Sequence, residues 1–479
     1  MIFVIALTAI AVVTLLVVAF TKGFEQTLPY AAFLYLLFPE ESKIPIPGLF
    51  DMTTQRFMTI TLLVLCLFLG KRNEAAPRKL PLKLGVIAMV LWSTVAALNS
   101  VVFTISLKAV LSQFLDYFVI YFLFVRYTSS TDMVRKILFG LVSGMAVCSI
   151  FGLLETYAGW TVMSLFPVML HRFAVASGNL YVDMARGIRA QSTFGHPILL
   201  GSAIAMVIPI ALYLISLSKS SKQKLFLWFT VALMFACIYK TGSRGPWMAS
   251  FITLSVLLFC GGRTRLRKYL SVIAFLTIAV LIVRPGVWET LANRYSSTFS
   301  KDSSEGESYT YRFAVLQVCA REIGKSVPRM IWGYGPESFV HLGITGDFNG
   351  RTLVYTSCDN SIALLMVETG YVGFAIAILI LATALRRAYR AYKKLPKPAN
   401  GLSIVLFTSI AAFAFMMTNV AIWAWGQENI LLWIIIALSV SYPGLVAHET
   451  KPESEEEPAD DRNAAMTYPS WDDPATVTP

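Results

Sequence analysis

Charged side chains are scarce in this sequence of 479 residues. Asp, Glu, Lys and Arg make up 14% of it, whereas a soluble domain carries about 25%. In their place the chain has repeated apolar runs of roughly 15–25 residues, which is the length that crosses a bilayer as an α-helix. The scarcity of charge excludes an ordinary soluble domain, and the apolar runs predict an all-α polytopic membrane protein.

Cysteine and histidine are also few, with six and four residues. No His, Cys and Asp residues have the spacing of metal ligands, so the sequence predicts no metal and no cofactor. Cys319 and Cys358 lie in a large polar region, where an oxidising compartment would allow a bridge that spacing alone does not establish. Four cysteines lie in apolar runs and are expected to be packing residues: Cys66, Cys148, Cys237 and Cys260.

The net charge of +12 is compatible with nucleic-acid binding, but its distribution is not. The basic residues cluster in short loops between apolar runs, which is the bias of cytoplasmic loops in membrane proteins. We therefore expect membrane lipids, and no nucleic acid, as partners of the basic residues.

The apolar runs predict about 12–13 transmembrane helices, because the second run is short enough to lie in the interface instead. The first run lacks a basic leader and a small-residue cleavage site, so we interpret it as a retained span. The runs lie near residues 2–20, 28–38, 57–70, 84–99, 105–126, 134–157, 197–217, 225–239, 246–260, 269–284, 361–385, 401–419 and 427–442.

Five basic loops fall on the same side of these spans, and this side is predicted to be cytoplasmic. The loops lie at 71–83, 126–136, 219–224, 263–268 and 386–397. The chain then divides into N-terminal spans (1–157), an outward-facing loop (158–196), central spans with a Ser-Arg-Gly turn (197–284), a large outward-facing loop (285–358), C-terminal spans (359–445) and an acidic cytoplasmic tail (446–479), which we expect to be disordered.

The large outward-facing loop is predicted to contain an amphipathic helix at 308–324. Its apolar face is expected to carry Phe313, Leu316, Ala320 and Ile323. The polar string at 301–308 in front of it is typical of a flexible linker.

Arginines on the outward-facing side need a reason other than topology, and anion binding or pairing with loop acids are the two alternatives. In "TGSRGPW" (241–247), Arg244 lies at the start of a span with Pro246 in its first turn. Free N–H groups and a guanidinium there would bind an anion, although an arginine that reaches lipid headgroups would look the same. The stretch "RAQSTFGHPILLGS" (189–202) adds Arg189 and His196 near Arg186.

Carboxylates occur beside these arginine segments. Asp359 and Asn360 lie at the outer end of a span, with Glu368 further along it. Asp359 in this position fits a general base and a helix N-cap equally well. Lys108 and Asp116 lie inside one span and are expected to pair with each other or with neighbours. "GYGPESF" (333–339) would fold round a sugar or phosphate, or form a plain turn.

Three arginine segments and a carboxylate at one membrane surface fit a lipid-linked diphosphate, whose charges lie at the headgroup plane. The alternatives are a secondary transporter or flippase of an anionic substrate, and a structural partner in an export complex.

The order of three motifs resembles the O-antigen ligase and O-antigen polymerase-like superfamily. The motifs are "TGSRG" opening a span, "YRFAVLQVCAREIGKSVPRMIWGYGPESF" (311–339) and "DNSIALLMVETGYVG" (359–373). "STFGHPILLGS" (192–202) resembles a further element of the family, and the similarity covers roughly residues 185–385.

The resemblance implies a GT-C-like glycosyltransferase of the bacterial inner membrane. Its donor would be an undecaprenyl-diphosphate-linked glycan, its active site would face the periplasm, and it would use no cofactor. Arg244 matches the family's Ser-Arg-Gly arginine, Arg312 the arginine that opens the amphipathic helix, and Arg189 the arginine before the Thr-Phe-Gly element. Ligases have a histidine where this chain has Asp359. This difference favours a polymerase of exopolysaccharide or O-antigen repeat units over a ligase acting on lipid A core or protein.

The expected mechanism is an inverting displacement. Asp359 takes the proton of the acceptor glycan's hydroxyl, and Arg312 acts with it at the reacting centre. The expected substrate-binding residues are Arg189, Arg244, Arg186, His196, Asn360 and Glu368. Flippase and chain-length regulator proteins are the expected protein partners.

Overall fold

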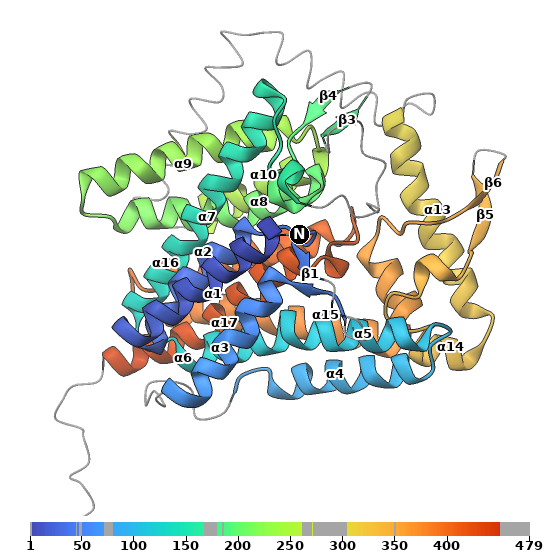
Figure 1. Ribbon diagram of the computed structural model, residues 1–479, viewed down its shortest axis with the longest axis horizontal. Coiled ribbons are helices and arrows are strands. Elements are labelled where there is room, and N and C mark those ends of the chain that lie inside the picture. The colour runs from blue at the N-terminus through green and yellow to red at the C-terminus, as the bar shows by residue number, and fades with distance from the viewer. Residues whose placement is uncertain are drawn as a thin grey trace, which may run out of the picture.

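The computed structural model describes residues 2–44, 46, 50–70, 80–166, 180–183, 186–260, 271, 304–348 and 351–450. The described chain is a bundle of helices with three short hairpins (Figure 1). Its α-helices are α1 (Ile2–Lys22), α2 (Thr27–Leu37), α3 (Thr54–Leu69), α4 (Lys83–Leu98), α5 (Phe103–Gln113), α6 (Ile120–Tyr127), α7 (Thr131–Ala158), α8 (Pro197–Leu217), α9 (Ser221–Lys240), α10 (Arg244–Cys260), α13 (Ser304–Gly324), α14 (Val327–Trp332), α15 (Ser361–Lys394), α16 (Asn400–Met416) and α17 (Gly426–Glu449).

The predicted class, an all-α polytopic membrane protein, is confirmed. Seven described helices are long and apolar enough to cross a membrane, one of them formed by α5, the π-helix η2 (Phe114–Val119) and α6 together. Four shorter apolar helices are α3, α4, α10 and α16. The predicted run 28–38 corresponds to α2, and the run 269–284 lies outside the described residues except for 271.

Two helices form the centre of the bundle. In the most apolar stretch of α8, 94% of the residues are buried, and in that of α17 the share is 83%, as expected of helices that are hydrophobic on every face. Around them, α1 exposes Ile2, Ile10 and Phe20 at 85%, 62% and 70%. Large exposed apolar side chains along one helix are typical of a surface covered by lipid.

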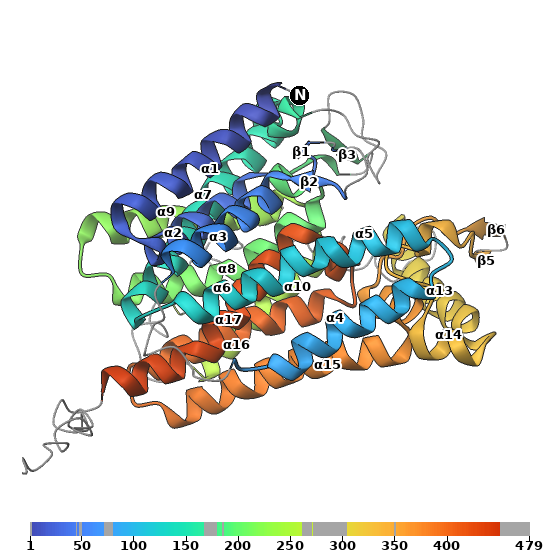
Figure 2. The same ribbon diagram turned by 60° about the horizontal axis from the view of Figure 1, so that its bottom comes forward.

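The extramembrane elements gather at one end of the bundle. Figure 2 shows α13, α14 and the hairpin of β5 (Thr345–Phe348) and β6 (Arg351–Val354) at its right end. The hairpin of β1 (Lys43–Ile44) and β2 (Met52–Thr53) joins α2 to α3, and that of β3 (Tyr181–Asp183) and β4 (Gly187–Arg189) precedes α8. The C-terminal end of α17 lies at the opposite end.

The amphipathic helix exists, but its predicted apolar face is wrong. The buried side chains of α13 are Val315, Val318, Cys319 and Ile323, whereas Phe313 is 52% exposed. The helix carries two overlapping apolar stripes, and its packing against α15 and β5 buries the one that contains Cys319. The predicted linker 301–308 is also wrong from Ser304 onward, because α13 begins there, while 301–303 lie outside the described residues.

Helix α15 is broken at Gly370, which has φ 68° and ψ −179°. The break leaves three carbonyl oxygens without intrahelical partners, and groups from outside the helix donate to them. The amide of Tyr334 donates to Val367 O (2.8 Å), the amide of Gly335 to Glu368 O (2.9 Å), and Trp92 Nε1 to Thr369 O (2.8 Å). The loop with the "GYG" string therefore fixes the first half of α15.

Candidate active site

The Ser-Arg-Gly turn joins α9 to α10, and two arginines of the β3–β4 hairpin hold it. Arg189 donates from Nε to Thr241 O (2.8 Å) and from Nη2 to Ser243 Oγ (2.6 Å). Arg186 donates from Nη1 to Gly242 O (3.1 Å). These bonds place Arg244 as the first, half-buried residue of α10.

The charge of Arg189 is already balanced within the hairpin. Its Nη1 lies 3.5 Å from Asp183 Oδ2, and its guanidinium covers the ring of Tyr181 at 5.0 Å. Arg186 shares the same carboxylate at 3.7 Å. Arg189 is only 5% exposed, so in this structure it positions the turn through groups of the chain itself.

Glu155, a carboxylate near the end of α7, was not among the predicted site residues. It accepts hydrogen bonds from the amides of Gln191 (2.7 Å) and Ser192 (2.9 Å) and from Thr161 Oγ1 (2.6 Å). The signal was present in the sequence, because an acid inside an apolar run indicates a specific partner. Glu155 fixes the segment between Arg189 and α8.

His196 and Asn360 cap helices. His196 Nδ1 accepts from Ile198 N (3.2 Å) at the start of α8, and Asn360 Oδ1 accepts from Ile362 N (2.9 Å) and Ala363 N (3.2 Å) at the start of α15. Burial, with the nearby charges of Arg189 and Arg312, lowers the pKa of His196 to about 3. At neutral pH its imidazole is therefore uncharged.

Asp359 does not cap α15. Its Oδ1 accepts from Ser357 Oγ (3.0 Å), and it lines a cavity. Its neighbour across the site is Arg312 of α13, whose Nε is buried and makes no hydrogen bond with the described residues. Burial and the charge of Arg186 lower the pKa of Arg312, although Asp359 acts in the opposite direction. No ion pair within 4.0 Å joins Arg312 to Asp359 in the described part of the chain.

These contacts define an arginine cluster that consists of Arg186, Arg189 and Arg312, with His196 among them. The Ser-Arg-Gly turn borders the cluster through its bonds to Arg186 and Arg189. The structure thus brings together side chains from three segments that are distant in the sequence.

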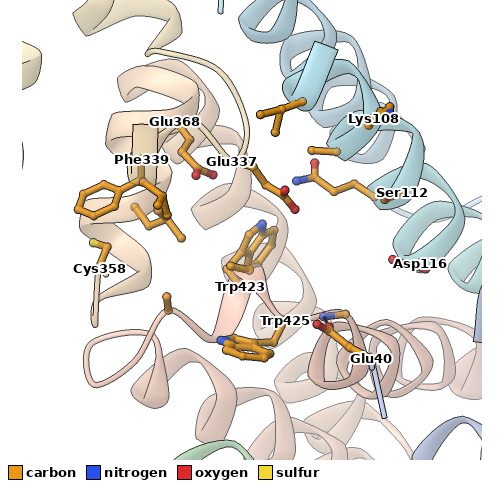
Figure 3. A pocket seen from close by; sticks show the side chains of 18 of the residues that line it. Glu40, Lys108, Ser112, Asp116, Glu337, Phe339, Cys358, Glu368, Trp423 and Trp425 are labelled. Carbon is orange, nitrogen blue, oxygen red and sulfur yellow. Dashed lines mark hydrogen bonds between the residues drawn. The ribbon is translucent and has the colours of Figure 1, made fainter. Parts of the chain in front are cut away.

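The cavity beside Asp359 has a volume of about 630 Å³, within the roughly 300–1,000 Å³ of small-molecule sites. It also contains the predicted Glu368, but none of Arg186, Arg189, Arg244, His196 or Arg312 lines it. Figure 3 shows Glu368 and Glu337 on one side of it, above Trp423 and Trp425. Asp359 is therefore the residue at which the arginine cluster and the cavity meet.

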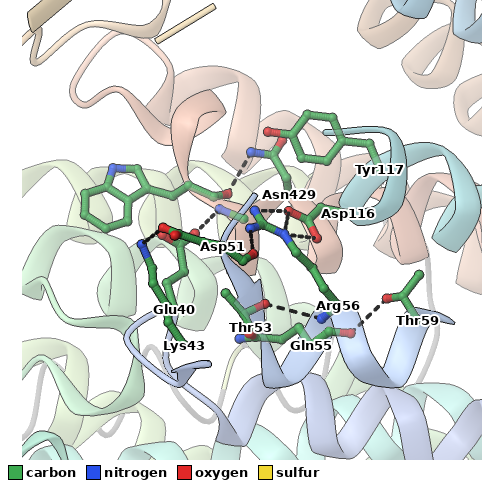
Figure 4. A network of polar contacts seen from close by, with 12 residues as sticks. Glu40, Lys43, Asp51, Thr53, Gln55, Arg56, Thr59, Asp116, Tyr117 and Asn429 are labelled. Carbon is green, nitrogen blue, oxygen red and sulfur yellow. Dashed lines mark hydrogen bonds and ion pairs between the residues drawn. The ribbon is translucent and has the colours of Figure 1, made fainter. Parts of the chain in front are cut away.

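A buried ion pair forms the floor of the cavity (Figure 4). Arg56 of α3 pairs with Asp116 of η2 at 2.8 Å, and the two side chains are 15% and 7% exposed. Asp116 thus pairs with a neighbour and not with Lys108, one of the two alternatives left by the sequence. Lys43 pairs with Asp51 at 2.7 Å at the same site.

Cys319 and Cys358 are both free thiols, buried in one apolar cluster between α13 and α15. Burial, and then the neighbouring Cys319, raises the pKa of Cys358 well above its ordinary value. Among the described residues, no group of three or more His, Cys, Asp or Glu side chains is placed to hold a metal ion.

A membrane-spanning helical scaffold with an arginine cluster and a carboxylate-lined cavity at one end defines a class of membrane protein that handles an anionic substrate at the bilayer surface. Residues 229–378 match the family model described as O-antigen ligase. The match includes the Ser-Arg-Gly turn, α13 and the start of α15, and it confirms the resemblance to O-antigen ligase and polymerase-like proteins. It supports glycosyltransferase function on lipid-linked glycans in a broad sense. A comparison with curated proteins found no match.

Proposed function

We propose that this protein is a polymerase that joins undecaprenyl-diphosphate-linked repeat units into exopolysaccharide or O-antigen. The observation that carries the proposal is the position of Asp359 between the arginine cluster and the cavity. Such a position places a carboxylate where an anionic donor on one side meets a hydroxyl acceptor on the other. The family match supports a glycosyltransferase but not this particular reaction.

In the proposed reaction the donor's diphosphate lies against Arg312 and the Ser-Arg-Gly turn. Arg312 has a buried Nε donor that makes no bond with the described residues. The acceptor's hydroxyl oxygen attacks the anomeric carbon, and Asp359 takes the proton. The bond between the anomeric carbon and the phosphate oxygen breaks, and undecaprenyl diphosphate leaves with its charge offset by the guanidinium. A single displacement inverts the anomeric configuration.

We assign Arg189, Arg186, His196 and Asn360 to positioning rather than substrate contact. The first two hold the turn in front of Arg244, and the last two cap α8 and α15. Their loss would displace Arg244 or Asp359 without removing a group that touches substrate.

The proposal includes the location and the partners of the enzyme. The loops at 219–224 and 386–397 lie between described helices at the opposite end of the bundle from the arginine cluster. By the positive-inside bias this opposite end is cytoplasmic, so the active site would face the periplasm of the bacterial inner membrane. Flippase and chain-length regulator proteins would then act on the same lipid-linked glycan before and after this enzyme.

Transport of an anionic substrate is the alternative, because the broken helix α15 is a feature of many transporters. In transporters, however, the backbone groups exposed at such a break bind the substrate or ion. In α15, Tyr334, Gly335 and Trp92 donate to the carbonyls at the break. This observation favours a structural role for the break.

The test uses the purified full-length protein in nanodiscs with undecaprenyl-diphosphate-linked repeat units. We expect a ladder of lengthening lipid-linked chains on a gel. Arg312→Ala and Asp359→Asn should each slow elongation by about a hundredfold or more, as expected for groups that act in the transition state. The matched controls are Arg321→Ala, an exposed arginine on the same helix, and Asp347→Asn, an exposed acid of β5.

Three results would contradict the proposal. A single transfer to lipid A core would indicate a ligase, and movement of intact lipid-linked units without a new glycosidic bond would indicate a flippase. Full elongation by both Arg312→Ala and Asp359→Asn would remove the mechanism even if the protein polymerises.

A further inference from the structure

The cavity beside Asp359 has a strong excess of acidic side chains. Six lining residues are Asp or Glu, and three are Lys or Arg. Two of the three cations belong to ion pairs, Lys43 with Asp51 and Arg56 with Asp116. The lining acids outside these two pairs are Glu40, Glu337, Asp359 and Glu368. A ligand that carries a carboxylate of its own would meet like charge here.

Two indoles form the opposite wall of the cavity. Trp423 and Trp425 come from the segment around η7 (Ile422–Ala424), and Figure 3 shows both of them facing the carboxylates. Trp423 is held in place, because its carbonyl accepts from Asn429 Nδ2 (2.8 Å) and its ring packs against Phe413 and Tyr117. Rigid aromatic faces provide an apolar surface whose π electrons attract C–H groups.

The carboxylates of Glu337 and Glu368 lie on the two segments that cross at the break in α15. The loop with Glu337 is fixed by the bond from Gly335 N to Glu368 O (2.9 Å) and by Ser106 Oγ, which donates to Pro336 O (2.7 Å). Glu337 itself has φ +57°. A residue other than glycine in this region of φ is strained, and such strain persists where the surroundings hold it for function.

Carboxylates and indoles on opposite walls are complementary to a sugar ring. The ring's hydroxyl groups donate to carboxylate oxygens, which only accept, and its C–H face lies on the aromatic surface. An amino group would add charge-assisted hydrogen bonds. A uronic acid would place its own carboxylate among four others.

We propose that this cavity binds the acceptor sugar and selects a neutral or amino-substituted sugar over a uronic acid. This inference rests on the proposed function, because it assigns the cavity to the acceptor that Asp359 deprotonates. Glu337 and Glu368 determine the specificity, and Trp423 and Trp425 provide the platform.

The experiment measures binding, so it needs no transfer reaction. Three disaccharides are used that differ only in the terminal residue, which is glucose, glucosamine or glucuronate. Their Kd values are measured by thermophoresis with the full-length protein in nanodiscs. We expect glucose and glucosamine termini to bind at least about tenfold more tightly than glucuronate, the smallest effect expected of like charges held together. Equal or tighter binding of the glucuronate disaccharide would overturn the inference.

Variants then test which residues cause the preference. Glu337→Gln and Glu368→Gln, singly and together, should narrow the difference in Kd between the glucose and glucuronate termini, because amides still hydrogen-bond sugars but carry no charge. Asp132→Asn, an exposed acid paired with Lys136 at the other end of α7, is the matched control and should leave the difference unchanged. A preference that persists in both glutamate variants would overturn the assignment.

The wild-type measurement stands even if a variant does not fold. Failure of this inference is also separable from failure of the proposed function. A protein that elongates lipid-linked chains but binds all three disaccharides alike would retain its proposed activity and lose only the acceptor selectivity.

Discussion

Replacing Gly370 by alanine tests the break in α15 directly. At φ 68° and ψ −179° the backbone occupies a region that only glycine adopts readily. A Cβ at this position would lie 2.1 Å from Ile331 O and 2.4 Å from Ile331 C, both of them backbone atoms. The two segments would therefore have to separate, which would break the bonds from Tyr334 N and Gly335 N to the carbonyls of α15.

The expected cost follows from these terms. Backbone strain at such a φ and ψ contributes roughly 1–3 kcal/mol, and each lost hydrogen bond contributes about 1 kcal/mol. We therefore expect Gly370→Ala to reduce the free energy of unfolding by about 3–5 kcal/mol. Because Asp359 lies just before the shifted half-helix, elongation activity should fall as well.

Two other glycines separate the causes. Gly343 has φ +57° and no atom within 4 Å of the place where a Cβ would lie, so Gly343→Ala should show backbone strain alone, about 1–2 kcal/mol. Gly444 lies in α17 with an ordinary φ and open space, so Gly444→Ala should be neutral or slightly stabilising. Thermal unfolding in detergent, followed by tryptophan fluorescence, gives the order of midpoints. A Gly370→Ala protein that unfolds no earlier than Gly343→Ala would refute the close crossing.

Three further changes give distinct outcomes. His196 has a pKa of about 3 when folded and about 6.5 when unfolded, so its contribution to stability is present above about pH 6.5 and is lost as the pH falls toward 3. His196→Asn keeps the cap and should lose less thermal stability than wild type between about pH 7 and pH 4; equal losses would contradict this account. Asp116→Asn leaves Arg56 buried without its partner and should cost about 3–5 kcal/mol, whereas adding Arg56→Gln should restore part of the loss in a double-mutant cycle. Arg244→Lys should reduce elongation nearly as much as Arg244→Ala, because a point charge lacks the guanidinium's fork, and full activity of the lysine variant would remove the bidentate contact.

The membrane class and most helices were predictable because they depend on long apolar runs, which are a local property of the chain. The face of α13 was not predictable in the same way. Both of its apolar stripes satisfy helical spacing, and the choice between them depends on the β5–β6 hairpin and α15, which are distant in the sequence.

The candidate site divides along the same line. Motif order pointed to Arg189, Arg312 and Asp359, and the structure places them near one another. The roles of the caps, however, depend on which atom accepts a hydrogen bond. Asn360, and not the adjacent Asp359, accepts the amides of α15, and sequence spacing does not distinguish the two.

The acidic cavity was missed because its residues carry no shared motif. Glu40, Arg56, Glu337 and Trp425 come from four separate segments, and each looks like an ordinary loop or helix-end residue when taken alone. Only the fold brings them together.

Gly333 and Gly370 behave as a single joint. A Cβ at Gly333 would lie 2.6 Å from the backbone of Glu368, just as one at Gly370 would meet Ile331. Neither position tolerates a side chain while the other segment stays where it is. Anyone who builds chimaeras of this protein by exchanging the large loop with that of a relative would therefore need to transplant the first half of α15 with it, or the two pieces would not fit.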